Sequence, residues 1–204
     1  MARDFSYMHF KKGEEKITIC LEKKIHKTGF AGFVGSPRFQ ENILLCVADE
    51  RLAKLNIRGG YITTKEDGSD PRVFLDSNTF DNIKRGDIAA RFMLFHEMGH
   101  YCCGHLASPP DVQEESKRRK ALISQGKVSE EEVEADRFAA EYLGPETVME
   151  ALQEAQENRF AFDLYNGTQN EECSILAVRE FRLRMDAIAT YFGIADEYED
   201  EEEN

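Results

Sequence analysis

The spacing of apolar residues changes along this chain, from short runs in its first part to helical intervals later. Three short runs rich in β-branched and other apolar residues predict strands: 15–21, 61–65 and 72–76. The turn-rich residues 66–71 join the last two runs, which predicts a β-hairpin. Four later segments have apolar residues at intervals of three and four and predict helices: 87–106, 129–143, 146–157 and 171–192. Strands that precede a series of helices are typical of an α+β fold.

Between the predicted strands at 15–21 and 61–65, the sequence predicts a loop and a further helix. Glycine and aromatic residues fill positions 29–35, which predicts a loop. Ser36 and Pro37 suit the N-cap and the first position of a helix, and the Gly59-Gly60 pair suits its end. We therefore predict a helix from Pro37 to about residue 56.

The predicted helix over 87–106 contains the sequence His96-Glu97-Met98-Gly99-His100. Each residue of an α-helix advances by about 100°, so His96 and His100 project within about 40° of each other. Two imidazoles placed in this way can bind one divalent cation, and Glu97 can reach a water molecule there without being a ligand. This is the H-E-x-x-H arrangement of zinc hydrolases, in which the glutamate is the general base. The alternative is a core helix with a solvated Glu97, but that carboxylate lies in an apolar run, where burial without a partner is costly.

A third metal ligand is expected elsewhere, because catalytic zinc sites of this kind combine two histidines with one carboxylate. The predicted helix over 129–143 offers Glu132 and, four residues later, Asp136 on the same face. We predict Glu132 as the ligand. We predict that Asp136 accepts the free ring N–H of a ligand histidine, which fixes the tautomer of that histidine.

Two alternatives to Glu132 as a ligand remain open. Ser129 and Glu132 match a capping box, in which Glu132 would reach back to the Ser129 N–H instead of binding a metal. Glu134 is the rival ligand in the same helix, and Glu130 and Glu131 are weaker rivals.

Residues close to the two histidines have other predicted roles. Gly99 lies on the ligand side of the helix, where a missing side chain would let another backbone approach closely. Cys103 returns to the same side and is predicted to pack there, whereas His105 projects roughly 140° from His100 and is predicted not to be a ligand. Four side chains are candidates for stabilising an oxyanion, and the sequence does not choose among them: Tyr61, Tyr101, Tyr142 and His105.

The two motifs together resemble the ImmA/IrrE family of cytosolic zinc metallopeptidases. The resemblance rests on Arg91-Phe92-x-x-x-His96-Glu97-Met98-Gly99-His100 and on Glu132-x-x-Ala135-Asp136-Arg137-Phe138-Ala139-Ala140-Glu141-Tyr142-Leu143-Gly144-Pro145. Residues 60–62 and 72–76 are similar to the family's short hairpin before the zinc helix, so the resemblance covers roughly residues 37 to 145.

The resemblance implies a small zincin-like domain with a zinc ion on His96, His100 and Glu132 and with Glu97 as the base. It also implies limited proteolysis of a partner protein, typically a helix-turn-helix repressor. The chain departs from the family in a charged insert at 117–125 and in residues 146–195, which carry no recognisable motif.

The length of 204 residues indicates one domain with a helical addition. We divide it into a metallopeptidase domain (1–145), a C-terminal helical part packed on that domain (146–194) and an acidic tail (195–204) that we expect to be disordered. The last nine residues hold seven of the acids behind the net charge of −13. An acidic chain is not expected to bind nucleic acid or anionic membranes directly. The one basic cluster, 117–120, is predicted to be a solvated helix face.

The expected compartment is the cytosol. The chain has no apolar run long enough for a transmembrane helix, and its first residues lack the apolar region of a signal peptide. Its five cysteines are an odd number and include the adjacent pair Cys102-Cys103, which does not suggest a disulfide framework.

The sequence thus predicts a zinc endopeptidase that acts on a regulatory protein. Two alternatives remain: a metallopeptidase-like binding, sensing or antitoxin-type module without protease activity, and a zinc hydrolase of small amides. A hairpin edge that can bind an extended chain favours a peptide substrate over a small amide.

Overall fold

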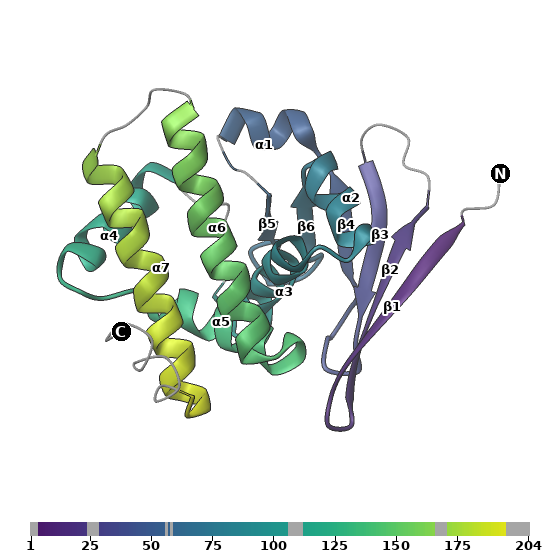
Figure 1. Ribbon diagram of the computed structural model, residues 1–204. Helices are drawn as coiled ribbons and strands as arrows, with labels where there is room; N and C mark the ends of the chain where they lie inside the picture. The colour runs from purple at the N-terminus through teal and green to yellow at the C-terminus, as the bar shows by residue number, and fades with distance from the viewer. Residues whose placement is uncertain are drawn as a thin grey trace.

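The computed structural model describes residues 4–23, 29–55, 57, 59–105, 112–165 and 171–194. In these residues a mixed sheet is followed by a group of helices, so the predicted α+β class is confirmed (Figure 1). The acidic tail at 195–204 and the predicted loop at 108–110 lie outside the described residues.

The described sheet has six strands in the order β1-β2-β3-β4-β6-β5. Their bounds are Phe5–Lys12 (β1), Glu15–Glu22 (β2), Gly29–Gly35 (β3), Ile43–Val47 (β4), Gly60–Thr63 (β5) and Arg72–Leu75 (β6). Strands β4 and β6 are parallel, whereas every other neighbouring pair is antiparallel. The predicted strand at 15–21 and the predicted hairpin of β5 and β6 are confirmed, and β5 is an edge strand of the sheet.

The helix predicted over 37–56 is wrong, and so is the loop predicted over 29–35. Residues 29–35 form β3, and most of the predicted helix is replaced by β4 and by a short helix, α1 (Asp49–Leu55). Ser36 caps only a turn, because its hydroxyl accepts the Arg38 N–H at 3.3 Å. Alternate residues of β4 are fully buried on one face, and a short apolar run of this kind suits a central strand as well as a helix.

Six further helices follow in the described residues: α2 (Ser77–Arg85), α3 (Ile88–Cys102), α4 (Val112–Ser124), α5 (Glu130–Leu143), α6 (Pro145–Tyr165) and α7 (Glu171–Phe192). Asp87 is the N-cap of α3, since its carboxylate accepts the Ala90 N–H at 2.8 Å. The sequence analysis missed α2 because Phe80 and Ile83 are its only apolar residues, too few for a helical period. None of the described helices is both long enough and apolar enough to cross a membrane.

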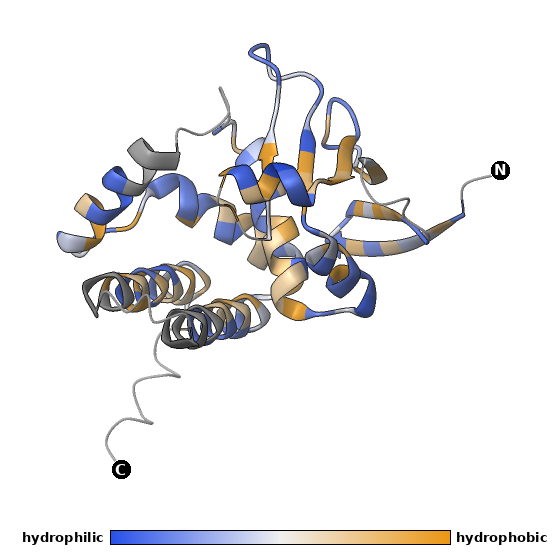
Figure 2. Cartoon of the chain, turned by 90° about the horizontal axis from the view of Figure 1, so that it is seen from above, coloured by the Kyte–Doolittle hydropathy of each residue, from blue (hydrophilic) through white to orange (hydrophobic). Residues whose placement is uncertain are grey.

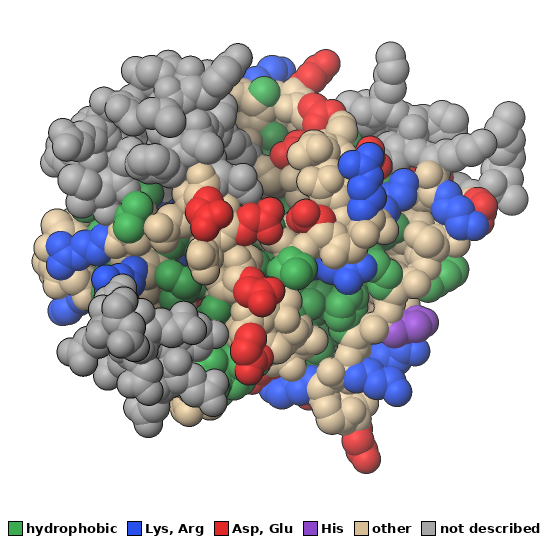
Figure 3. Space-filling view, viewed as in Figure 1, with side chains coloured by type: hydrophobic (Ala, Val, Ile, Leu, Met, Phe, Trp, Pro, Cys, Tyr) green, Lys and Arg blue, Asp and Glu red, His purple; other side chains and the backbone are tan. Residues whose placement is uncertain are grey.

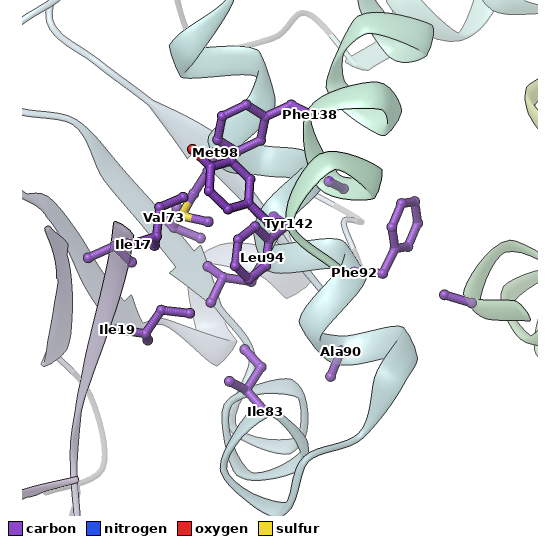
Figure 4. Close-up of a cluster of buried hydrophobic side chains, with 14 of the residues drawn as sticks. Ile17, Ile19, Val73, Ile83, Ala90, Phe92, Leu94, Met98, Phe138 and Tyr142 are labelled. Carbon is purple, nitrogen blue, oxygen red and sulfur yellow. The ribbon is translucent and has the colours of Figure 1, made fainter. Parts of the chain in front are cut away.

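Helix α3 lies between the sheet and the other large helices, so it is covered on two sides (Figure 1). The core joins Ile17 and Ile19 of the sheet to Leu94 and Met98 of α3, and Phe138 of α5 packs against the same cluster (Figure 4). Helices α6 and α7 lie side by side; α6 packs on α3 and α5, and α7 packs on α5. The view along their axes shows hydrophobic and hydrophilic residues on each (Figure 2). This packing explains why α3 is apolar almost all round.

The close approach predicted at Gly99 is confirmed. A Cβ atom at this position would lie 2.7 Å from the Ala135 Cα and 2.8 Å from the Ala135 carbonyl oxygen of α5. Because both atoms belong to the backbone, they cannot rotate away. The absence of a side chain at Gly99 therefore sets the distance between α3 and α5.

We predict that Gly99→Ala destabilises the protein, although alanine is the better helix former by about 1 kcal/mol. The added methyl group has to push two helices apart, and overpacking of this kind typically costs about 1–3 kcal/mol. Chemical denaturation measures the free energy of unfolding. The matched control is Gly35→Ala, whose Cβ would meet only the side-chain amide of Asn42. Equal stability of the two variants would contradict a backbone contact at Gly99.

Candidate metal centre

Helices α3 and α5 bring the three predicted ligands together. The Nε2 atoms of His96 and His100 lie 3.1 Å apart. The Glu132 carboxylate lies 3.5 Å from Nε2 of His96 through Oε2 and 3.6 Å from Nε2 of His100 through Oε1. Because the ligand atoms lie this close together, His96, His100 and Glu132 form a group that could hold a metal ion.

The donor atoms have the spacing that a tetrahedral metal requires. Ligand bonds of about 2.0–2.1 Å in tetrahedral geometry place donor atoms about 3.3 Å apart, close to the three observed distances. The Nδ1 atom of His96 lies 2.8 Å from Oδ1 of Asp136, which accepts its proton and leaves a lone pair on Nε2. That lone pair faces the Glu132 carboxylate and Nε2 of His100, an arrangement of electron-rich atoms that a cation would stabilise.

Asp136 lies where the sequence predicts it, one helical turn beyond Glu132 and in contact with a histidine. Its carboxylate is fully buried and also accepts two hydrogen bonds from Arg184 of α7, both at 2.6 Å. Arg184 reaches Glu132 as well, with Nη1 3.3 Å from Oε2. One guanidinium therefore joins the metal group to the C-terminal helix.

Sequence reasoning missed Arg184, although the pattern of α7 contains a signal for it. Phe181, Met185 and Ile188 form the apolar face of this helix, and position 184 falls on the same face. A charged residue on a buried face needs a partner of opposite charge, and the carboxylates of α5 are that partner.

The electrostatics of the group follow from this burial and pairing. Burial alone would raise the pKa of Asp136, but Arg184 and His96 hold that pKa below its usual value. Burial likewise opposes ionisation of Glu132, yet His100, His96 and Arg184 hold its pKa well below the usual range. Burial lowers the pKa of Arg184, and its acidic partners more than reverse this effect and raise the pKa. The carboxylates of Asp136 and Glu132 are therefore ionised, and their negative charges balance the positive charge of Arg184.

Glu97 lies next to the group and is bound to the edge strand. Its Oε2 accepts the backbone N–H of Ile62 in β5 at 2.9 Å. Burial raises the pKa of Glu97 to about 7, and the nearby charge of Glu132 acts in the same direction against the opposing effect of His100. The carboxyl group is thus held in place by a neutral donor and not by a counter-ion.

The two alternatives to Glu132 as a ligand now have an outcome. Ser129 is the N-cap of α5 but makes no capping hydrogen bond through its side chain, and its hydroxyl accepts from Arg118 instead. The capping-box alternative is therefore wrong. Glu134, the rival ligand, faces away from Glu132, with Oε2 2.7 Å from Nε2 of His105.

A second group in the described residues could hold a metal ion: Cys103, His105 and Glu134. Cys103 is exposed, so its predicted role in packing is wrong. His105 is not part of the first group, but its Nδ1 lies 3.1 Å from Nδ1 of His100.

Two of the four candidates for stabilising an oxyanion are engaged elsewhere. The Tyr61 hydroxyl accepts a hydrogen bond from Arg51, and the Tyr142 hydroxyl donates to Glu15 at 2.9 Å. Tyr101 packs edge-on against Phe39. His105 is engaged as well, through His100 and Glu134, which leaves Tyr101 as the candidate.

Acidic and basic side chains gather on different parts of the visible face. Figure 3 shows acidic side chains near its centre and basic ones mainly toward the strands. In the basic cluster of α4, Lys117, Arg118 and Lys120 are exposed as predicted, whereas Arg119 pairs with Glu180 of α7.

Comparison with known proteins gives no match: no family model, no curated protein and no solved structure matches this chain.

We predict that Arg184→Met destabilises the fold by about 3–5 kcal/mol, the usual cost of leaving a buried charge without its partner. Asp136 would remain fully buried with only His96 beside it. Chemical denaturation at neutral pH measures the loss. The control is Arg182→Met on the same helix, where the side chain is exposed and a change within about 0.5 kcal/mol is expected. A similar effect of both variants would contradict the buried ion pair.

Proposed function

We propose that this protein is a zinc-dependent endopeptidase that cleaves a partner regulatory protein in the cytosol. In this proposal His96, His100 and Glu132 bind zinc, and Glu97 is the general base. The observation that carries it is the position of Glu97, which lies between the metal-binding group and the backbone of an edge strand.

The donor set supports zinc. Two imidazole nitrogens and one carboxylate, with a position left for water, are the ligands of catalytic zinc in H-E-x-x-H hydrolases. Asp136 fixes the His96 ring with Nε2 toward the metal group, as an outer carboxylate does in such sites. Zinc, when bound, supplies Lewis-acid polarisation of water and of a peptide carbonyl group.

Glu97 is suited to proton transfer by its attachment. The Ile62 N–H holds Oε2, so the plane of the carboxyl group is fixed while Oε1 has no hydrogen-bond partner in the described part of the chain. In the proposed reaction Glu97 takes a proton from the attacking water and then gives it to the leaving amine.

The edge strand supports a peptide as the substrate. Strand β5 pairs with β6 on one side only, and the Ile62 N–H points to the other side, toward Glu97. An extended peptide added to that side would lie beside the metal-binding group, with main-chain hydrogen bonds to β5 groups other than the Ile62 N–H, which binds Glu97. An edge strand beside the metal-binding helix is consistent with the zincin-like fold that the resemblance to the ImmA/IrrE family implies. We include this arrangement in the proposal.

A selective partner is more consistent with this proposal than bulk digestion, because an unselective protease in the cytosol would damage the cell. The family resemblance points to a helix-turn-helix repressor, which is an argument by analogy. The second candidate function is a binding or sensing module with the same fold. The complete His-His-Glu group with Glu97 beside it favours the enzyme over this module.

We predict that Glu132→Ala loses bound zinc, because it removes one of three ligands. Glu131→Ala is the matched control, since this neighbour pairs with Arg118 on the surface. Elemental analysis after dialysis measures zinc per chain. Asp136→Asn should keep the site but weaken zinc by about tenfold to a hundredfold. Full occupancy in Glu132→Ala, with loss in Glu134→Ala, would show that the ligand assignment is wrong.

We predict that Glu97→Gln retains zinc and the fold but loses at least about a hundredfold in turnover, because removal of a general base has effects of this size. The assay incubates the zinc-loaded protein with casein and with a repressor encoded by a neighbouring gene, and mass spectrometry maps the products. We expect one preferred cut in the repressor, absent with Glu97→Gln.

Broad degradation of casein without preference for the repressor would contradict the selective function. If zinc is bound but neither protein is cut, the binding module becomes the better description. Unchanged turnover in Glu97→Gln would exclude Glu97 as the base.

A further inference from the structure

His105 lies behind His100, on the side away from the metal-binding group. Its backbone N–H donates to the His100 carbonyl oxygen at 3.0 Å, just beyond the end of α3. Its ring lies between two partners, with Nδ1 3.1 Å from Nδ1 of His100 and Nε2 2.7 Å from Oε2 of Glu134. The His105 side chain is only 9 % exposed, so its contact with His100 is shielded from water, whereas Glu134 is 44 % exposed and water reaches that end.

The proton positions follow from one constraint. Nε2 of His100 faces His96 and Glu132, and it must carry a lone pair to bind a metal. In a neutral imidazole the proton of His100 is then on Nδ1, from which it can be donated to Nδ1 of His105. The proton of His105 is in turn on Nε2, which donates to the Glu134 carboxylate.

We propose that His105 and Glu134 form a relay that positions His100 as a metal ligand. The proposal rests on the metal site of the proposed function and assigns two positioning residues to it. The relay does for His100 what Asp136 does for His96: each metal-facing imidazole has its other nitrogen fixed by a group that helix α5 holds in place. Glu134 therefore acts through His105 and is not a ligand.

The competing interpretation is a second metal on Cys103, His105 and Glu134. The two interpretations use the same nitrogen differently, because Nε2 of His105 either donates a proton to Glu134 or binds a cation. The distance of 2.7 Å between Nε2 and Oε2 is a hydrogen-bond distance and is shorter than the spacing of about 3.3 Å between ligands of one tetrahedral ion. The geometry favours the relay.

Two substitutions of His105 separate the two ends of the relay. In His105→Asn the side-chain oxygen takes the place of Nδ1 and can still accept from His100. In His105→Gln the amide nitrogen takes the place of Nε2 and keeps the contact with Glu134, but the acceptor for His100 is lost. Cys103→Ser is the control for the second metal.

The experiment measures zinc affinity by competition with a chromophoric chelator. We expect His105→Gln to bind zinc about tenfold to a hundredfold more weakly, because removal of a hydrogen-bond partner of a ligating histidine has effects of this size. We expect His105→Asn to be much less affected and Cys103→Ser to match the wild type at one zinc per chain. A role of His105 in packing alone would not distinguish asparagine from glutamine in this order.

Nitrogen-15 NMR of the histidine rings in the zinc-loaded wild type gives a second readout, with a proton expected on Nδ1 of His100 and on Nε2 of His105. The opposite tautomer of His105, or a second zinc lost in Cys103→Ser, would overturn the relay. Equal affinity of His105→Gln and wild type would overturn the relay alone. A wild-type chain that binds no zinc would overturn the relay together with the proposed function.

Discussion

The contact of Gly99 with Ala135 is the constraint on which the site depends. The two residues touch backbone to backbone, and the four side chains at the centre flank them: His96 and His100 on α3, Glu132 and Asp136 on α5. Carboxylate side chains are short, so they reach the imidazoles only if the helix axes come this close. A single missing methyl group on α3 therefore controls the spacing of the donor atoms.

This proximity buries two carboxylates between the helices, and Arg184 of the C-terminal helix compensates for their charge. Arg184 pairs with Asp136 and Glu132, and Arg119 of α4 pairs with Glu180 one turn earlier on α7. The core contacts of α7 hold the guanidinium in position, since Ile188 and Ala189 are buried beside α5 and α6. Hydrophobic packing thus supports an arrangement of charges that would be unfavourable by itself.

The sequence predicts the parts of this site that depend on local spacing. His96, His100, Glu132 and Asp136 are each one helical turn from a partner, and helical geometry alone places each pair on one face. The apolar face of α7 marks Arg184 as buried, but the sequence could not predict its partner, because the contact with Asp136 spans 48 residues and depends on how α7 packs. The error at β4 has a related cause, since its neighbours β3 and β6 decide that it is a strand.

The location of Arg184 has a consequence for how the molecule matures. A ribosome completes α3 and α5, with all the proposed metal ligands, before it has made the helix that neutralises Asp136. Until α7 docks, Asp136 lacks its Arg184 partner, and α5 and α6 lack the packing that α7 provides. The centre therefore assembles last, after synthesis has passed residue 184, so a nascent or truncated chain lacks the finished site. Under the proposed function, such an order leaves a chain that is still being made without a working site.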